Sequence, residues 1–142
     1  MSKTIKLGLA ILAVWFLAAS ALAQDNYTIN VSYNKFFGPY LVNQSGFTLY
    51  YFTDDAGKAG SECYGDCAQS WPPFYAENIR VPDSLRGVDF TTQKRTDGRS
   101  QTAFRGWPLY LYVGDRASGD YFGRDLDQKW YPVDPTNQRV NI

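Results

Sequence analysis

The chain carries the same aromatic stretch twice. GFTLYYFTDD spans residues 46–55 and GWPLYLYVGD spans residues 106–115, sixty positions further on. Both stretches read Gly-x-x-Leu-Tyr-x-aromatic-x-x-Asp, and each is followed by a tryptophan beside proline, Trp71 in the first copy and Trp130 in the second. A unit this short cannot bury its own aromatic face in water. The repetition therefore predicts two related units, at about residues 40–76 and 88–135, that bury their faces against each other.

Local patterns along the two units favour β-structure. Apolar and polar residues alternate from Tyr27 to Tyr33, which is the period of a strand. Asp97-Gly98 separates two strand-like runs and predicts a hairpin. Aromatic residues, which favour strands, make up 17% of the chain, and no long segment after residue 23 has the period of a helix. The prediction is an all-β fold: a single small domain with short hairpins, further strands near 47–52 and 129–133, and a break at Gly38-Pro39.

The N-terminus is typical of a secretory signal peptide. Lys3 and Lys6 accompany an uncharged apolar run over residues 7–22, and the run ends in the small-x-small sequence of residues 21–23. The run is shorter than the about 20 residues that a membrane-spanning helix needs. We therefore predict a signal peptide at residues 1–23 and a mature domain at residues 24–142 without a transmembrane span. An uncleaved anchor is the alternative. The expected location is secreted or extracytoplasmic, with association to the cell surface as a variant.

Composition excludes several classes of function. The sequence has no histidine, which excludes a Ser-His-Asp triad, a histidine-ligated metal site and a c-type haem attachment. Its 14 Lys and Arg balance 14 Asp and Glu, so we expect no nucleic acid partner and no anionic lipid surface as partner. A carboxylate-driven glycosidase needs two facing acids, and nothing in the sequence pairs them. We expect a protein that is not an enzyme.

Six motif residues carry a resemblance to a known family: Tyr50, Phe52, Asp55, Tyr110, Tyr112 and Asp115. They match the Tyr-x-aromatic-x-x-Asp motif, and CYGDCA before WPP and the stretch RTDGRSQTAFRGWPLYLYVGD match as well. The chain resembles the secreted-repeat family of predicted bacterial and archaeal lipoproteins over about residues 40–135. The family has no assigned function, so the resemblance implies an extracytoplasmic location and no activity. This chain lacks a cysteine at the cleavage site, so we interpret it as free or retained by other contacts.

The two cysteines lie four positions apart, at Cys63 and Cys67. In an oxidising compartment such a pair favours a disulfide, which would tie one loop of the domain. A redox-active pair is the functional alternative, because short-loop disulfides can be reducible. A metal site is a further alternative, although two thiolates without histidine would need carboxylate ligands.

Carboxylates near the ends of the two motif strands allow two interpretations. Asp55 and Asp115 follow strand ends, where an aspartate commonly accepts backbone N–H groups in a turn. The alternative is a Ca²⁺ ion with oxygen ligands, although no twelve-residue EF-hand loop is present. We expect no cofactor, with Ca²⁺ as the alternative. Weak candidate ligands are Asp55, Asp115, Asp120, Asp125 and Asp127.

Aromatic side chains outside the core would be free to bind a partner. Alternate residues of each motif strand face opposite ways, so we expect one set in the core and the other set either covering the second repeat or exposed. Exposed Tyr and Trp rows pack on partner proteins or stack on sugars. Trp71, Trp107 and Trp130 are the candidate binding aromatics, and Asn26, Asn30 and Asn43 begin candidate glycosylation sequons.

These observations together predict a non-catalytic secreted or cell-surface β module. We expect its partner to be an envelope or extracellular protein or an envelope or matrix polymer. The alternative is an envelope redox or metal-linked protein that uses Cys63 and Cys67 or the turn carboxylates.

Overall fold

A computed structural model of the protein describes residues 2–5, 8, 11, 13–14 and 25–142. The predicted signal peptide lies largely outside the described residues. In the part of the chain that is described, no helix is long and apolar enough to cross a membrane. Residues 25–142 form the predicted all-β fold, with one five-residue helix, α1 (Asp66–Ser70). Three short 3₁₀ turns complete the elements: η1 (Thr53–Asp55), η2 (Gly87–Asp89) and η3 (Leu126–Gln128).

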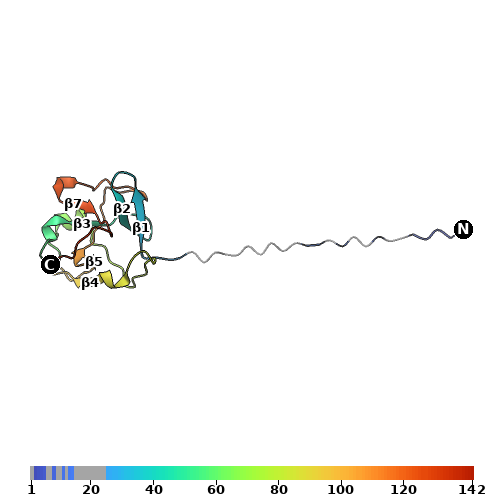
Figure 1. Ribbon diagram of the computed structural model, residues 1–142, viewed down its shortest axis with the longest axis horizontal. Helices are drawn as coiled ribbons and strands as arrows, with labels where there is room; N and C mark the ends of the chain where they lie inside the picture. Colours follow the sequence, from blue (N-terminus) through green and yellow to red (C-terminus); the bar gives the residue numbers. More distant parts are fainter. Residues whose placement is uncertain (1, 6–7, 9–10, 12, 15–24) are drawn as a thin grey trace.

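Two antiparallel hairpins form the outer parts of the molecule. The first joins β1 (Ile29–Asn34) to β2 (Gly38–Asn43). The second joins β4 (Phe90–Lys94) to β5 (Ser100–Phe104), and β6 (Trp107–Pro108) pairs with the other edge of β5. Figure 1 shows the first hairpin on the right of the domain, β3 (Tyr50–Phe52) beside β7 (Trp130–Pro132) on the left, and β4 and β5 below.

Turn chemistry explains where the hairpins begin and end. The hairpin predicted around Asp97-Gly98 is confirmed, and Gly98 has the positive φ (87°) that this turn requires. The predicted break at Gly38-Pro39 is wrong, because β2 begins at Gly38 and the reversal falls just before it. There the Asn34 side chain accepts the Phe36 N–H at 2.8 Å and closes the turn. The strand predicted at 47–52 is shortened to Tyr50–Phe52.

The two repeats are interleaved at their motif tyrosines. The backbone N–H of Tyr50 donates to the carbonyl of Tyr110 at 2.9 Å, and the N–H of Tyr110 donates back to Tyr50 at the same distance. On its other side Tyr50 lies opposite Pro132, and Tyr110 lies opposite Pro73. Each motif strand therefore lies between the motif strand and the proline segment of the other repeat. The arrangement has a pseudo-twofold axis between the two tyrosines.

This central layer is covered on both faces. Leu49 and Leu109 belong to one hydrophobic cluster, whereas Tyr50 and Tyr110 belong to the other, and all four are 0% exposed. Of the two arrangements expected for the second alternate set, the one in which it covers the other repeat is therefore found at Tyr50 and Tyr110. The first cluster holds Ile29, Leu41, Leu49, Phe74, Phe90, Phe104, Leu109 and Val133, and the second holds Tyr50, Phe52, Cys63, Ala68, Trp71, Tyr110 and Trp130.

Candidate functional site

Each motif tyrosine donates its hydroxyl to the motif aspartate of the other repeat. Tyr50 Oη lies 2.7 Å from Asp115 Oδ2, and Tyr110 Oη lies 2.7 Å from Asp55 Oδ2. All four residues are buried. We call these two pairs the tyrosine–carboxylate couples. Since the phenol and the carboxylate of each couple come from different repeats, neither repeat contains a complete couple.

The second oxygen of each carboxylate closes a loop. Asp55 Oδ1 accepts the N–H of Glu62 at 2.7 Å, and Asp115 Oδ1 accepts the N–H of Phe122 at 2.9 Å. Both donors follow their aspartate by seven residues. The interpretation that these aspartates accept backbone N–H groups is confirmed, but they reach across a loop instead of forming the expected short turn.

Burial sets the protonation of the couples. It raises the pKa of Asp55 to about 6, against the opposing effect of the hydrogen bonds from Tyr110 and the Glu62 N–H. Burial likewise raises the pKa of Asp115 above its ordinary value. The pKa values of both tyrosines are raised further above 10, first by burial and then by the nearby carboxylates. The geometry fits a neutral phenol donating to a carboxylate in each couple, since both oxygens of each carboxyl group accept hydrogen bonds.

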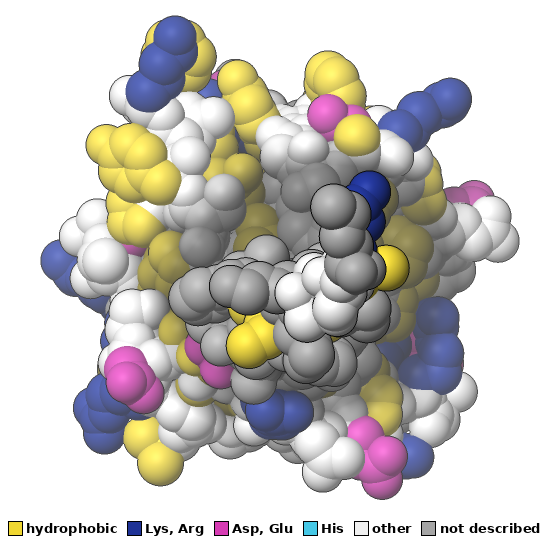
Figure 2. All heavy atoms as spheres, turned by 90° about the vertical axis from the view of Figure 1, so that its right-hand side faces the viewer, with side chains coloured by type: hydrophobic (Ala, Val, Ile, Leu, Met, Phe, Trp, Pro, Cys, Tyr) yellow, Lys and Arg dark blue, Asp and Glu magenta, His cyan; other side chains and the backbone are white. Residues whose placement is uncertain are grey.

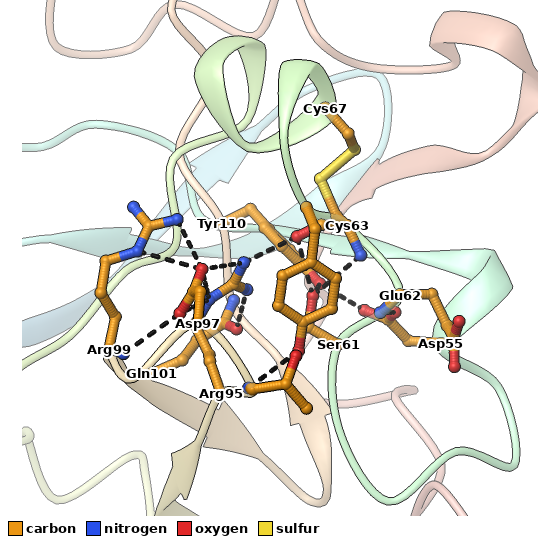
Figure 3. Close-up of polar contacts among 12 residues, drawn as sticks. Asp55, Ser61, Glu62, Cys63, Cys67, Arg95, Asp97, Arg99, Gln101 and Tyr110 are labelled. Carbon is orange, nitrogen blue, oxygen red and sulfur yellow. Dashed lines mark hydrogen bonds and ion pairs between the residues drawn. A yellow bond between two sulfur atoms is a disulfide. The ribbon is translucent and has the colours of Figure 1, made fainter.

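The two couples differ in their third partner. The Tyr110 hydroxyl lies 2.6 Å from Ser61 Oγ, whereas the Tyr50 hydroxyl accepts the Gly123 N–H at 3.2 Å. Ser61 Oγ also accepts the Cys63 N–H at 3.0 Å. The Tyr110 couple is thereby joined to the loop that carries the cysteines (Figure 3).

A buried arginine connects that loop to the β4–β5 hairpin. Arg95 is 4% exposed and donates to the carbonyl of Cys63 at 2.7 Å and to Gln101 Oε1 at 2.8 Å (Figure 3). Asp97 lies 3.1 Å from the same guanidinium, and the ring of Tyr64 covers it with 4.4 Å between the guanidinium carbon and the ring centre. A buried cation with this many partners has a structural role. The sequence predicts only the turn here and carries no signal that Arg95 is buried.

Four aromatic rings lie in a parallel stack beside the couples. The order is Phe52, Trp130, Trp71 and Tyr112, with ring centres 4.2, 3.8 and 4.4 Å apart. We call this set the aromatic stack. Its two central rings meet at the pseudo-twofold axis with an interplanar angle of 2°.

The stack changes the interpretation of the tryptophans. Trp71 and Trp130 are 6% and 3% exposed, so the prediction that they form a binding surface is wrong: they fill the space between the repeats. Trp107 is half-buried, packs edge-on against Tyr51, and donates its indole N–H to the Arg139 carbonyl at 2.8 Å.

The predicted disulfide between Cys63 and Cys67 is confirmed. Cys63 is fully buried and Cys67 is half-buried against the second cluster. Among the residues described, no group of three or more Cys, Asp or Glu side chains could hold a metal ion. Asp120 instead accepts the N–H groups of Arg116 and Ala117, and Asp125 accepts the Tyr131 hydroxyl. The remaining candidate ligand, Asp127, lies in η3 and is exposed.

The three candidate sequons lie around the first hairpin. Asn26 precedes β1, exposed Asn30 lies within it, and Asn43 ends β2. The side chain of Asn43 accepts the N–H groups of Ser45 and Phe47, so it is already part of a turn. Glycosylation at these positions stays a prediction.

A separate cluster of aromatic rings lies at the tip of the β1–β2 hairpin. The ring of Phe37 contacts Tyr40 and Tyr121, with 5.2 Å between centres in each case. Lys35 and Arg124 lie over neighbouring rings of this cluster. We call the set the tip patch; its members are Tyr33, Lys35, Phe36, Phe37, Tyr121 and Arg124. The sequence does not predict the tip patch, because two adjacent phenylalanines in a hairpin carry no signal that distinguishes a surface from a core.

Comparison with known proteins identifies the repeats. A family model described as a secreted repeat of unknown function matches residues 34–75 and 91–134, which together make up more than half of the chain. No curated protein and no solved structure matches the chain. Each matched segment contains one motif tyrosine and one motif aspartate, so the couples are formed between the two matches. The chain therefore belongs to this family of extracytoplasmic proteins, the secreted repeats of unknown function, and contains two copies of the repeat.

Proposed function

We propose that the protein is a non-catalytic extracytoplasmic binding module that uses the tip patch to dock on a protein of the envelope or the extracellular space. The observation that carries this proposal is the gathering of exposed aromatic rings and unpaired cations at one hairpin tip. Tyr33 is 74% exposed and Phe36 is 76% exposed. None of the ion pairs among the described residues includes Lys35 or Arg124.

Two separate parts of the chain build the patch, which supports a preformed surface. Phe37 of the hairpin packs edge-on against Tyr121, and Arg124 lies 5.2 Å from the centre of the Phe37 ring. Aromatic residues and arginine are enriched where protein partners dock. Burying the exposed rings would remove apolar area from water at about 25 cal/mol per Å².

The orientation of the rings favours a protein over a polysaccharide. Phe37 is inclined by 56° to Tyr40 and by 69° to Tyr121, so the rings do not form the flat platform on which sugars stack. A ridge of inclined rings fits an apolar groove. On the side of the domain that faces the viewer in Figure 2, hydrophobic, basic and acidic side chains are mixed, and no large area carries charges of one sign. A partner would therefore be recognised by contacts with the tip patch itself and not by a long-range electrostatic field. The two unpaired cations favour a groove with acidic side chains at its rim.

Site-specific photo-crosslinking in the envelope of the producing cell tests this proposal. A benzophenone amino acid is placed at Phe36, at Tyr33 and, as the control, at Val88, which is 75% exposed and lies outside the patch. We expect one protein to be captured from positions 36 and 33 but not from 88. Charge reversal by Lys35→Glu with Arg124→Glu should abolish that capture.

The captured protein then allows a direct measurement. Its affinity for the purified module should fall with Phe36→Ala and with added salt, but not with Val88→Ala. Equal capture from Val88, capture that survives charge reversal, or capture of a glycan or lipid alone would reject the tip patch as a protein-docking surface.

A further inference from the structure

The aromatic stack and the two couples are joined by direct ring contacts. Tyr110 meets Trp130 edge-on, with ring centres 5.1 Å apart at 90°. Tyr50 meets Trp71 in the same way at 5.3 Å and 79°. Each phenol thus touches an indole on one side and a carboxylate on the other. This order of groups recurs in both halves of the pseudo-twofold arrangement.

Such an order suits the transfer of single electrons. Indole and phenol rings are the side chains that one-electron oxidants oxidise most readily after thiols, and ring contact at these distances lets an electron pass between them. A phenol loses its proton on oxidation, because the phenol radical cation is a strong acid. The carboxylate that already accepts the hydroxyl at 2.7 Å is positioned to take that proton. Among the described residues, no such acceptor is hydrogen-bonded to the indole rings, so the unpaired electron would settle on the phenol as a neutral tyrosyl radical.

We infer that the aromatic stack and the tyrosine–carboxylate couples form a one-electron relay. An external oxidant, such as an oxidised metal centre or an oxygen-centred radical, takes one electron from Trp71 or Trp130. The resulting indole radical cation then takes an electron from Tyr50 or Tyr110, and the hydroxyl proton moves to Oδ2 of Asp115 or Asp55. The products are a neutral tyrosyl radical, a protonated carboxyl group and a restored indole. A reduced metal centre or a thiol supplies the electron that resets the tyrosine, and the proton returns from the carboxyl group.

The surroundings of the relay support this assignment. The tyrosines are 0% exposed, which shields a radical from solvent. An electron can nevertheless leave the aromatic stack for an external oxidant at two places. Half-buried Tyr112 ends the stack on one side. A surface hollow lined by Phe52, Trp71 and Trp130, together with Lys129 and Asp127, gives access to the rings at the Phe52 end.

Flash photolysis of the mature protein tests the relay, with photogenerated tris(bipyridine)ruthenium(III) as the one-electron oxidant. In the unaltered protein we expect the optical signal of an indole radical to decay while that of a tyrosyl radical grows. The double variant Tyr50→Phe with Tyr110→Phe keeps the rings but should lose this growth and leave a long-lived indole radical. The control, Tyr75→Phe, removes an exposed tyrosine that lies outside the relay and the tip patch, and it should leave the conversion unchanged.

Further variants separate a loss of the relay from a loss of folding. Trp71→Phe with Trp130→Phe retains a ring at each position but removes the oxidisable indoles, and it should abolish the fast formation of the tyrosyl radical. Asp55→Asn with Asp115→Asn retains the phenols and should slow the conversion of indole to tyrosyl radical. If the couples had a purely structural role, these substitutions would change the free energy of unfolding but not the transient spectra. Conversion that persists unchanged in the Tyr50→Phe, Tyr110→Phe protein, or that is lost equally in the exposed-tyrosine control, would overturn the relay.

Discussion

Tyr50 and Tyr110 exchange two backbone hydrogen bonds of 2.9 Å, while their side chains reach the aspartates of opposite repeats. The backbone contact and the side-chain contacts therefore hold the same two segments together. This relationship gives the motif a physical meaning. The tyrosine pairs with its counterpart in the other repeat, the aromatic residue two positions later joins the stack, and the aspartate accepts the tyrosine hydroxyl of the other repeat.

Removing either tyrosine hydroxyl should destabilise the domain. Tyr110→Phe and Tyr50→Phe each leave a buried carboxylate without its phenol donor, which costs about 1–3 kcal/mol. Because the couples are related by pseudo-twofold symmetry, we expect the two losses to be similar. Urea unfolding measures both, and Tyr33→Phe serves as the control because that side chain is 74% exposed. Losses no larger than that of the control would mean that the couples do not stabilise the fold.

Stability should rise as the pH falls from about 7.5 to 5. The pKa of Asp55 is about 6 in the folded protein and about 3.9 in an unfolded chain, so the folded state binds more protons between these values. The contribution is therefore complete below pH 4 and is lost as the pH rises through 6. The raised pKa of Asp115 acts in the same direction. Arg99 and Arg95 lower the pKa of Asp97, so the titration of Asp97 changes stability only at pH values below 5.

The unfolding free energy should be larger at pH 5 than at pH 7.5 by on the order of 1–2 kcal/mol. Urea unfolding across this range measures the slope, and the Asp55→Asn protein should show a smaller one because position 55 no longer titrates. A slope of the opposite sign in the unaltered protein, or an unchanged slope in Asp55→Asn, would contradict the assignment of the raised pKa to Asp55.

Close packing against the aromatic stack should make Gly123 sensitive to substitution. A Cβ atom at this position would lie 2.6 Å from Trp71 Cη2 and 2.9 Å from Tyr50 Cζ, both in rigid buried rings. Gly123→Ala should therefore cost about 1–3 kcal/mol through overpacking. Gly60→Ala is the matched control, since a Cβ atom there meets nothing within 4 Å. Thermal melting compares the two, and equal midpoints would show that the stack moves aside without cost.

Local signals in the sequence predicted the parts of the fold that depend on neighbouring residues. The Asp97-Gly98 pair identified its hairpin because the tight turn between Lys94 and Ser100 needs a residue such as Gly98, which adopts a positive φ. Two cysteines four positions apart identified the disulfide. The duplicated motif predicted two units that share a core, which the interleaved strands confirm. In each case the relevant partners lie close in the chain or are repeated within it.

Partners distant in the chain could not be predicted in the same way. Tyr50 and Asp115 are 65 residues apart, and nothing in a turn-forming aspartate indicates which phenol it will accept. Trp71 and Trp130 are candidate binding aromatics in the sequence because nothing near them in the chain tells a buried Trp from an exposed one, whereas their stacking is a product of the pseudo-twofold pairing. The tip patch depends on Phe37 meeting Tyr121, a contact between the two matched repeats.

Loss of the disulfide should weaken the domain without unfolding it. The bond joins residues only four positions apart, so closing this small loop restricts the unfolded chain modestly, by about 2 kcal/mol. The loop has other attachments, because the Cys63 carbonyl accepts Arg95 and the Cys63 N–H donates to Ser61. Cys63→Ala with Cys67→Ala should therefore lower the urea midpoint but keep a cooperative transition.

Mass measurement after alkylation, with and without reductant, confirms the state of the cysteines in the unaltered protein. A reductant should lower the stability of the unaltered protein and leave the double variant unchanged. Complete unfolding of that variant would mean that the loop is held mainly by the bond and that the contacts of Arg95 and Ser61 depend on it.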